Sequence, residues 1–211
     1  HGLSRPIIIG QMLGEADADR VVSAAGTQVG DEIILTKGIA IEATALIAIE
    51  KGEQLAGEYP ESFLSRCNNY LKDPGISVVK DARVAVETGG VHAMHDPTEG
   101  GLASGLHELA KASGTGLLLE ADRVRILPEA EVLCRKYGLD PLGTIASGAL
   151  LITSDPSFTS SIIEQLKGAN IAAEKIGVIQ EAKFGCKMKR RGKVTELPMF
   201  SRDEIGKIFE Q

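Results

Sequence analysis

The stretch His95-Asp96-Pro97-Thr98-Glu99-Gly100-Gly101 separates a short apolar segment from a run of leucines with helical spacing. Aspartate is a preferred residue immediately before a helix, and proline is favoured at the first helical position. Glu99, three residues after Asp96, would complete a capping box. The pattern therefore predicts a strand over 91–95, a tight turn and a helix over 97–112.

The two glycines do not fit an ordinary helix start, because each costs about 1 kcal/mol relative to alanine inside a helix. One interpretation is that Gly100 and Gly101 admit a ligand, since a glycine-rich helix N-terminus offers amide donors to an anion. The other is that they only let the helix pack tightly against a sheet. Spacing alone favours neither interpretation.

Apolar segments of strand and helix type alternate along the rest of the chain. The expected strands lie at 7–9, 31–36, 91–95, 117–119, 148–153 and 176–179, with a late hairpin formed by 184–188 and 194–197. The expected helices lie at 39–50, 60–71, 76–87, 97–112, 128–137 and 155–167, with a last one after residue 201. This order predicts an α/β (α+β) fold with a mixed β-sheet packed with helices.

Two of these helices carry more specific predictions. The helix over 39–50 is apolar nearly all round, so we expect it to be well buried. The last helix is expected to be capped by Ser201, with Glu204 completing the capping box and Phe200 contacting Ile205.

The nine residues His95 to Ala103, followed by Ser113-Gly114-Thr115-Gly116-Leu117, resemble the C-terminal domain of the aminoimidazole ribonucleotide (AIR) synthetase superfamily. The segments 25–38 and 143–151 add to the resemblance, which covers roughly residues 5 to 185. Within the superfamily the chain is most similar to the hydrogenase expression/formation protein (HypE) branch. The resemblance implies that residues 31–211 are the C-terminal domain. Residues 1–30 would be a linker and a strand from an N-terminal domain that this chain lacks.

The resemblance also implies a function. Such enzymes use ATP and Mg²⁺ to activate an amide- or carbonyl-type oxygen by phosphoryl transfer, and most contacts to both cofactors come from the N-terminal domain. Expected partners are a small-molecule or protein-bound carbamoyl-type substrate, a hydrogenase-maturation partner protein and a second copy in a homodimer. The C-terminal domain would close the substrate cleft with the turn matched by Asp96, Thr98, Gly100 and Gly101.

The sequence departs from this pattern in two respects. It ends Ile208-Phe209-Glu210-Gln211, without the terminal cysteine that carries the reacting group in the hydrogenase-maturation branch, and it lacks the N-terminal half. We therefore expect the isolated domain to fold but not to hydrolyse ATP, and no cysteine in it to accept a carbamoyl-type group. The alternative is a non-catalytic interaction or regulatory module that keeps the fold.

Three short segments are candidates for binding substrate or nucleotide, and no catalytic base or nucleophile can be assigned. Lys37-Gly38 lies between a strand and a helix, where backbone amides and a cation face an anion. Ser147-Gly148 precedes a strand. The full candidate set is Lys37, Gly38, His95, Asp96, Thr98, Glu99, Gly100, Gly101, Ser147 and Gly148.

No metal site is predicted. His92 and His95 would point to opposite faces of a strand and could not share an ion. Asp96 alone could hold an Mg²⁺ that is already bound to phosphates, although a role as a helix cap explains it more simply.

Composition limits the remaining function classes. The net charge of −6 argues against nucleic-acid binding, and the basic residues between 187 and 193 are expected to form an exposed hairpin. No apolar run is long enough to span a membrane. The three cysteines have no metal-type spacing, and we expect Cys67 and Cys134 in the core of a cytoplasmic protein. Because the chain begins at His1 without a methionine, we expect it to be part of a longer protein.

Overall fold

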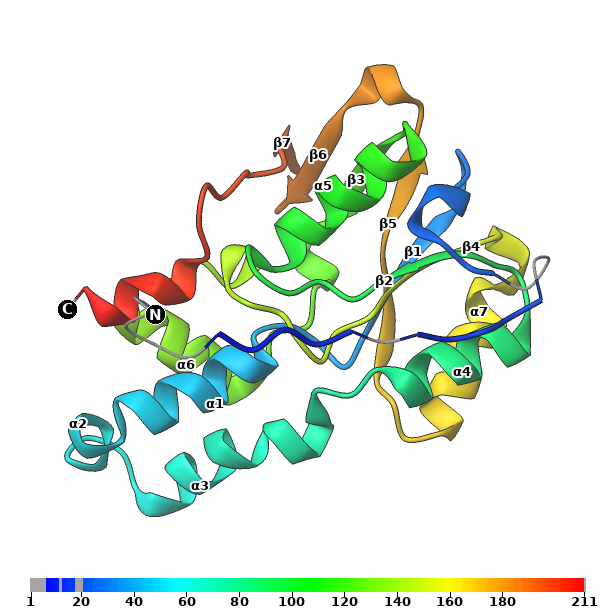
Figure 1. Ribbon diagram of the computed structural model, residues 1–211. Helices are drawn as coiled ribbons and strands as arrows, with labels where there is room; N and C mark the ends of the chain where they lie inside the picture. The colour runs from blue at the N-terminus through cyan, green and yellow to red at the C-terminus, as the bar shows by residue number, and fades with distance from the viewer. Residues whose placement is uncertain (1–6, 12, 18–20, 211) are drawn as a thin grey trace.

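The computed structural model describes residues 7–11, 13–17 and 21–210, which form one seven-stranded mixed sheet with helices around it (Figure 1). The strand order is β2-β4-β1-β5-β3-β6-β7. Neighbouring strands are antiparallel except for β3 and β6, which are parallel. The strands are β1 (Glu32–Thr36), β2 (Val91–His95), β3 (Gly116–Glu120), β4 (Leu151–Ser154), β5 (Ala173–Gln180), β6 (Cys186–Arg190) and β7 (Lys193–Glu196). The predicted mixed sheet is confirmed.

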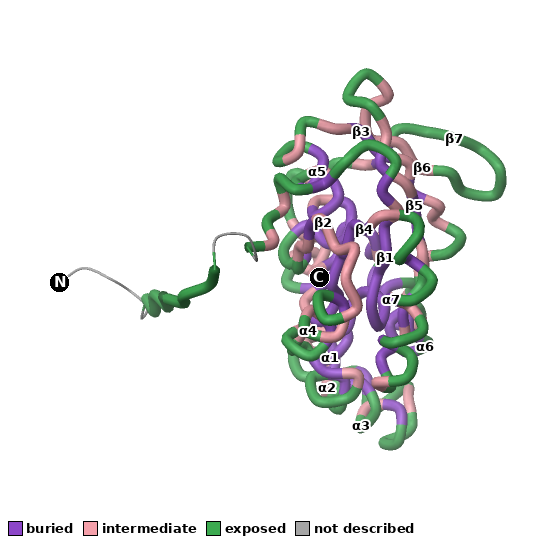
Figure 2. Tube along the Cα trace, turned by 90° about the vertical axis from the view of Figure 1, so that its right-hand side faces the viewer, coloured by how far each residue is buried: buried purple, intermediate pink, exposed green. Residues whose placement is uncertain are grey.

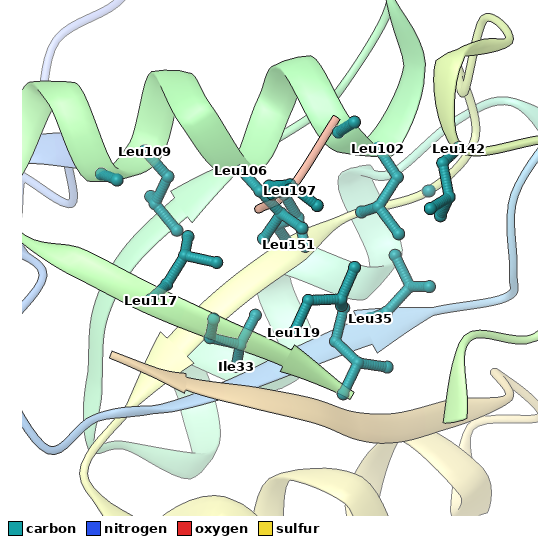
Figure 3. Packing of buried hydrophobic residues seen from close by; sticks show 14 of the residues in the cluster. Ile33, Leu35, Leu102, Leu106, Leu109, Leu117, Leu119, Leu142, Leu151 and Leu197 are labelled. Atoms are coloured by element: carbon teal, nitrogen blue, oxygen red, sulfur yellow. The ribbon is translucent and has the colours of Figure 1, made fainter. Parts of the chain in front are cut away.

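Helices cover both faces of the sheet because its central strands alternate between two apolar faces. Ile33 and Leu35 of β1 lie on the face of the sheet that α5 (Gly101–Ser113) covers. Figure 3 shows them beside the leucines of that helix. Ile34 lies on the opposite face of the sheet, which α4 (Val79–Thr88) and α7 (Pro156–Gly168) cover. The sheet is therefore buried in its middle strands, β1 and β4 above all.

A third apolar cluster lies beyond the end of β1 and contains no strand. Its main helices are α1 (Ile41–Glu50), α3 (Glu61–Asn69) and α6 (Pro128–Tyr137), with the short α2 (Gly52–Ala56) beside them. The predicted burial of the first helix is confirmed, since six of its ten residues are buried. The C-terminal 3₁₀ helix Glu204–Phe209 joins the cluster through Ile208, and Figure 1 shows it in red beside α6.

The predicted strand over residues 7–9 is wrong. Ile7, Ile8 and Ile9 form no strand and are 65–92% exposed, and the segment around them lies apart from the body in Figure 2. Three apolar residues favour a strand only where a neighbouring strand pairs with them, and none of the described residues does so. The rest of the predicted linker 1–30 lies partly outside the described residues.

The cysteines lie where the sequence predicts. Cys67 and Cys134 are buried, and burial raises the pKa of each thiol to about 12. Cys186 is half-buried in β6, and burial raises its pKa as well. Raised pKa values keep all three as poorly nucleophilic thiols at neutral pH.

Along the described residues, no helix has the length and apolar character that a membrane crossing requires.

Candidate functional site

The topology brings the three candidate segments to one edge of the sheet. β1 and β2 are both antiparallel to β4, which lies between them, so they run parallel to each other. Lys37-Gly38 follows β1 and the turn 96–101 follows β2, at the edge where β4 begins after Ser147-Gly148. A hydrogen bond from the Leu150 amide to the Thr36 hydroxyl joins two of the segments. The Ala146 amide, 3.2 Å from the Thr98 carbonyl oxygen, joins the segment at Ser147-Gly148 to the turn 96–101.

The glycines of the turn serve its backbone conformation. Gly100 and Gly101 have φ angles of +75° and +68°, in the left-handed region that favours glycine. A Cβ on Gly101 would lie 2.5 Å from the Leu142 carbonyl oxygen and 2.7 Å from that of Thr144. Close approach of protein backbone, the second of the two interpretations, therefore explains Gly101.

The predicted helix cap is wrong. The helix begins at Gly101 rather than residue 97, and the side chain of Asp96 is 70% exposed and caps nothing. The capping pattern Asp-Pro-Thr-Glu does not start a helix here, because Gly100 adopts a left-handed conformation and the helix begins only after it.

Asp203, which sequence reasoning missed, occupies the place of the cap. Its carboxylate accepts hydrogen bonds from the amides of Gly100 at 2.7 Å, Ile145 at 3.2 Å and Ile205 at 2.8 Å. Asp203, not Ser201, therefore caps the C-terminal helix. The pattern of Ser201 and Glu204 drew attention away from Asp203, which lies between them and can also cap a helix. Its bond to Gly100 could not be predicted, because the two residues are 103 positions apart.

Two backbone donors of the turn remain open. Pro97 has no amide hydrogen, the Gly100 amide donates to Asp203, and the Gly101 amide donates to the Thr98 carbonyl oxygen. Thr98 and Glu99 are exposed, and neither amide has an acceptor within the described residues. An anion at this turn could therefore use these two amides and the Thr98 hydroxyl.

The histidines beside the turn contact different carboxylates. His95 Nε2 lies 2.7 Å from Glu108 Oε2, and His92 Nδ1 lies 2.8 Å from Asp31 Oδ1. Across the described parts of the chain, no group of three or more His, Cys, Asp or Glu side chains is placed to hold a metal ion.

Lys37 contacts a different part of the chain from the turn. Its φ angle is +57°, and its buried ammonium lies 2.7 Å from the Ser77 carbonyl oxygen, 3.3 Å from that of Gly75 and 3.4 Å from Asp81 Oδ2. Burial lowers the pKa of Lys37, and the neighbouring Asp81 carboxylate opposes that shift. The structure thus places Lys37 at the predicted edge, but its charge is already balanced by Asp81.

The two remaining candidate glycines approach the backbone of other segments closely. A Cβ on Gly38 would lie 2.8 Å from the Arg125 carbonyl oxygen, and one on Gly148 would lie 3.0 Å from that of Gly75. Ser147 is half-buried, and its hydroxyl forms no hydrogen bond with any residue that the structure describes.

Residues 28–189 match the family model described as AIR synthase related protein, C-terminal domain. The chain belongs to this family. It is 26% identical over 200 residues to the carbamoyl dehydratase HypE of Cupriavidus necator, covering 93% of the chain and 54% of that protein. The AIR synthase-related chain thus spans about half the length of the curated relatives that it matches.

Solved structures share the fold of this family member. A hydrogenase maturation protein HypE in complex with ATP aligns with a TM-score of 0.67 and 20% identity, over 91% of the chain and 57% of that protein. HypE in a HypE–HypF complex aligns with a TM-score of 0.68 and 18% identity, over 85% and 56%. At these identities the likeness shows the fold alone, and it confirms the predicted fold class.

Replacing Asp203 with asparagine tests whether this carboxylate holds the turn. The amide group of asparagine cannot accept from three backbone N–H groups, so we expect the free energy of unfolding to fall by about 1–3 kcal/mol. Hydrogen exchange at the Gly100 amide should become faster. The matched control is Asp96→Asn, the cap that the sequence predicts, which should change stability by less than about 0.5 kcal/mol. A larger loss for Asp96→Asn than for Asp203→Asn would contradict the assignment.

Proposed function

We propose that this chain is the C-terminal part of an ATP-dependent enzyme of the HypE type, which activates an amide- or carbonyl-type oxygen by phosphoryl transfer. The observation that carries the proposal is the sheet edge where the turn 96–101 meets Lys37-Gly38 and Ser147-Gly148. There the Thr98 and Glu99 amides and the Thr98 hydroxyl are open donors. Unpaired backbone amides in a turn that leads into a helix can donate to phosphate oxygens.

In this proposal the chain contributes hydrogen-bond donors to the phosphates but not the complete active site. The exposed Asp96 and Glu99 side chains disfavour an anion at the turn, so a phosphate there needs a compensating cation. Lys37 is balanced by Asp81, which leaves this role to Mg²⁺ held by a preceding domain. In the proposal ATP and Mg²⁺ bind mainly to that N-terminal domain, and residues 96–101 close the cleft over the phosphates.

The proposed partners follow from the same relatives. A solved HypE structure is titled as a complex with ATP and another as a complex with HypF, and the curated relative is named a carbamoyl dehydratase. By analogy we propose a carbamoyl-type substrate, a hydrogenase-maturation partner protein, a homodimer of the longer protein and a cytoplasmic location. The alternative, a non-catalytic interaction module, would apply if the native reading frame held only this domain.

ATP hydrolysis by the native protein with its preceding domain tests the proposal. We expect Mg²⁺-dependent hydrolysis by the longer protein and none by residues 1–211 alone, which serve as the matched control. Thr98→Ala removes one donor to a charged group and should lower kcat/KM of the longer protein by a factor of about ten to a hundred. Thr195→Ala, at another exposed threonine in β7, should leave kcat/KM unchanged. Hydrolysis by residues 1–211 would contradict the proposal, as would an unaffected Thr98→Ala enzyme.

A further inference from the structure

The sheet ends in an open edge at β7. This strand pairs with β6 and with no other strand among the described residues, and all four of its residues are exposed. Figure 2 shows it at the margin of the molecule, beside β6. Five strands separate β7 from β2, which leads into the turn 96–101. The function proposed above therefore does not use this edge.

Alternate backbone groups of β7 point away from the sheet. The Leu197 amide donates to the Cys186 carbonyl oxygen at 2.9 Å, so these residues form a hydrogen-bonded pair at the end of the antiparallel ladder. Such pairs alternate with pairs whose N–H and C=O groups point away from the partner strand. Val194 and Glu196 occupy the alternate positions, so their N–H and C=O groups face outward. With no described strand on that side, the edge can receive an extended segment.

The hairpin of β6 and β7 carries an excess of positive charge. Its residues 187–193 include five cations, Lys187, Lys189, Arg190, Arg191 and Lys193. Lys187 lies over the Phe184 ring at 4.8 Å. The other four are exposed, and their side chains have no ion pair or hydrogen bond within the part of the chain that the structure describes. Since the whole chain has a net charge of −6, this positive surface is local, and it favours an acidic partner.

The two faces of the hairpin differ in charge. Alternate residues of β6 face the core under α5, and Arg190 continues that set at the end of the strand. Lys193 is opposite Arg190 in the ladder and shares its face, which is purely cationic there. The other face carries Lys189 and Glu196 on either side of Val194, which is 49% exposed. Acidic side chains of an added strand are therefore favoured on the first face and apolar ones on the second.

Two other occupants fit this edge less well. Pairing of β7 with the β7 of a second copy would bring two sets of unpaired cations into one interface, and charges on edge strands commonly prevent such self-association. A nucleic acid would satisfy the cations. It has no peptide backbone, however, to pair with the outward N–H and C=O groups of Val194 and Glu196.

We propose that β7 binds an extended acidic segment of a partner protein, which joins the sheet as a further strand. The residues of the segment opposite Val194 and Glu196 are its apolar ones, and their backbone groups bond to β7. Its acidic side chains lie on the face of Arg190 and Lys193. Backbone bonds supply affinity, and the alternation of acidic and apolar residues supplies specificity. Because binding needs neither ATP nor Mg²⁺, this proposal and the proposed function can fail separately.

Titration of the isotope-labelled chain with the blocked peptide Glu-Val-Glu-Thr-Glu-Val-Glu tests the surface. We expect saturable amide shifts at residues 187–196. Hydrogen exchange at the Val194 and Glu196 amides should become at least about tenfold slower, whereas the Lys193 and Thr195 amides should change little because they already bond to β6. Absent shifts, or slower exchange that does not alternate along β7, would overturn the proposal.

Peptide variants separate strand pairing from charge attraction. Methylation of the Val and Thr backbone nitrogens removes the donors that face β7 and should abolish binding. Methylation of the Glu nitrogens, which face away, should preserve it. The peptide Lys-Val-Lys-Thr-Lys-Val-Lys should not bind. Equal binding of the two methylated peptides would overturn the proposal, as would equally tight binding of a short oligothymidylate. Concentration-dependent shifts at residues 193–196 without peptide would assign the edge to a second copy instead.

Variants of the chain test the same contacts. Val194→Pro removes the outward N–H and spares the ladder with β6, so it should weaken binding of the acidic peptide at least about tenfold. Val194→Ala keeps that amide and should weaken binding less. Arg190→Gln should weaken binding, whereas Lys167→Gln removes an equal charge from the exposed end of α7 and should not. Equal effects within either pair would overturn the proposal, and the amide spectrum without peptide checks each fold.

Discussion

Replacing Lys37 with alanine is expected to lower the free energy of unfolding by about 3–5 kcal/mol. The ammonium is the only cation within 4 Å of the buried Asp81 carboxylate among the described residues, and it also bonds the Ser77 and Gly75 carbonyl oxygens. Without it, a carboxylate that already lacks one donor would be buried with no counter-charge. Chemical denaturation of the variant and the parent chain measures the loss.

Two further variants serve as controls for the stability of Lys37→Ala. Lys167→Ala removes an exposed lysine from the last turn of α7 and should change stability by less than about 0.5 kcal/mol. The double variant Lys37→Met with Asp81→Leu removes both charges, and it should recover most of the stability because apolar replacement of a buried pair is often neutral. A loss below about 1 kcal/mol in Lys37→Ala would show that the pair is solvated and would contradict this description of the edge.

Replacing Gly101 with alanine should be the most damaging change in the turn. A left-handed alanine costs about 1–2 kcal/mol, and crowding of a Cβ against the Leu142 and Thr144 backbone adds about 1–3 kcal/mol. Gly114→Ala is the matched control. It has nearly the same φ angle, +67°, at the other end of α5, but no atom lies within 4 Å of its Cβ position.

The difference between the two alanine variants measures the close backbone approach alone. Thermal melts should place Gly101→Ala well below Gly114→Ala, and equal melting temperatures would contradict the packing role of Gly101. A bulky residue at position 101 is therefore a poor probe of ligand binding, because it destabilises the fold first. Thr98 is the better probe, since it is exposed and its side chain is not needed for the turn.

The sequence allowed prediction wherever local pattern and tertiary packing agree. The strand over 91–95 has the predicted bounds, and the buried helix after β1 follows directly from its apolar residues. The turn between β2 and α5 could be located but not described, because its conformation depends on backbone from residues 142–145 and on the Asp203 carboxylate. Lys37 illustrates the same limit. Its place after a strand was predictable, whereas its partner Asp81 lies 44 residues further along the chain.

The central proposal is that the turn 96–101 borders a nucleotide cleft in the two-domain protein. Amide hydrogen exchange in the longer native protein, with and without ATP and Mg²⁺, tests it most directly. The Thr98 and Glu99 amides have no acceptor among the described residues, so they should exchange rapidly without nucleotide and at least about tenfold more slowly with it. Slower exchange confined to the preceding domain, with Thr98 and Glu99 unchanged, would contradict the proposal.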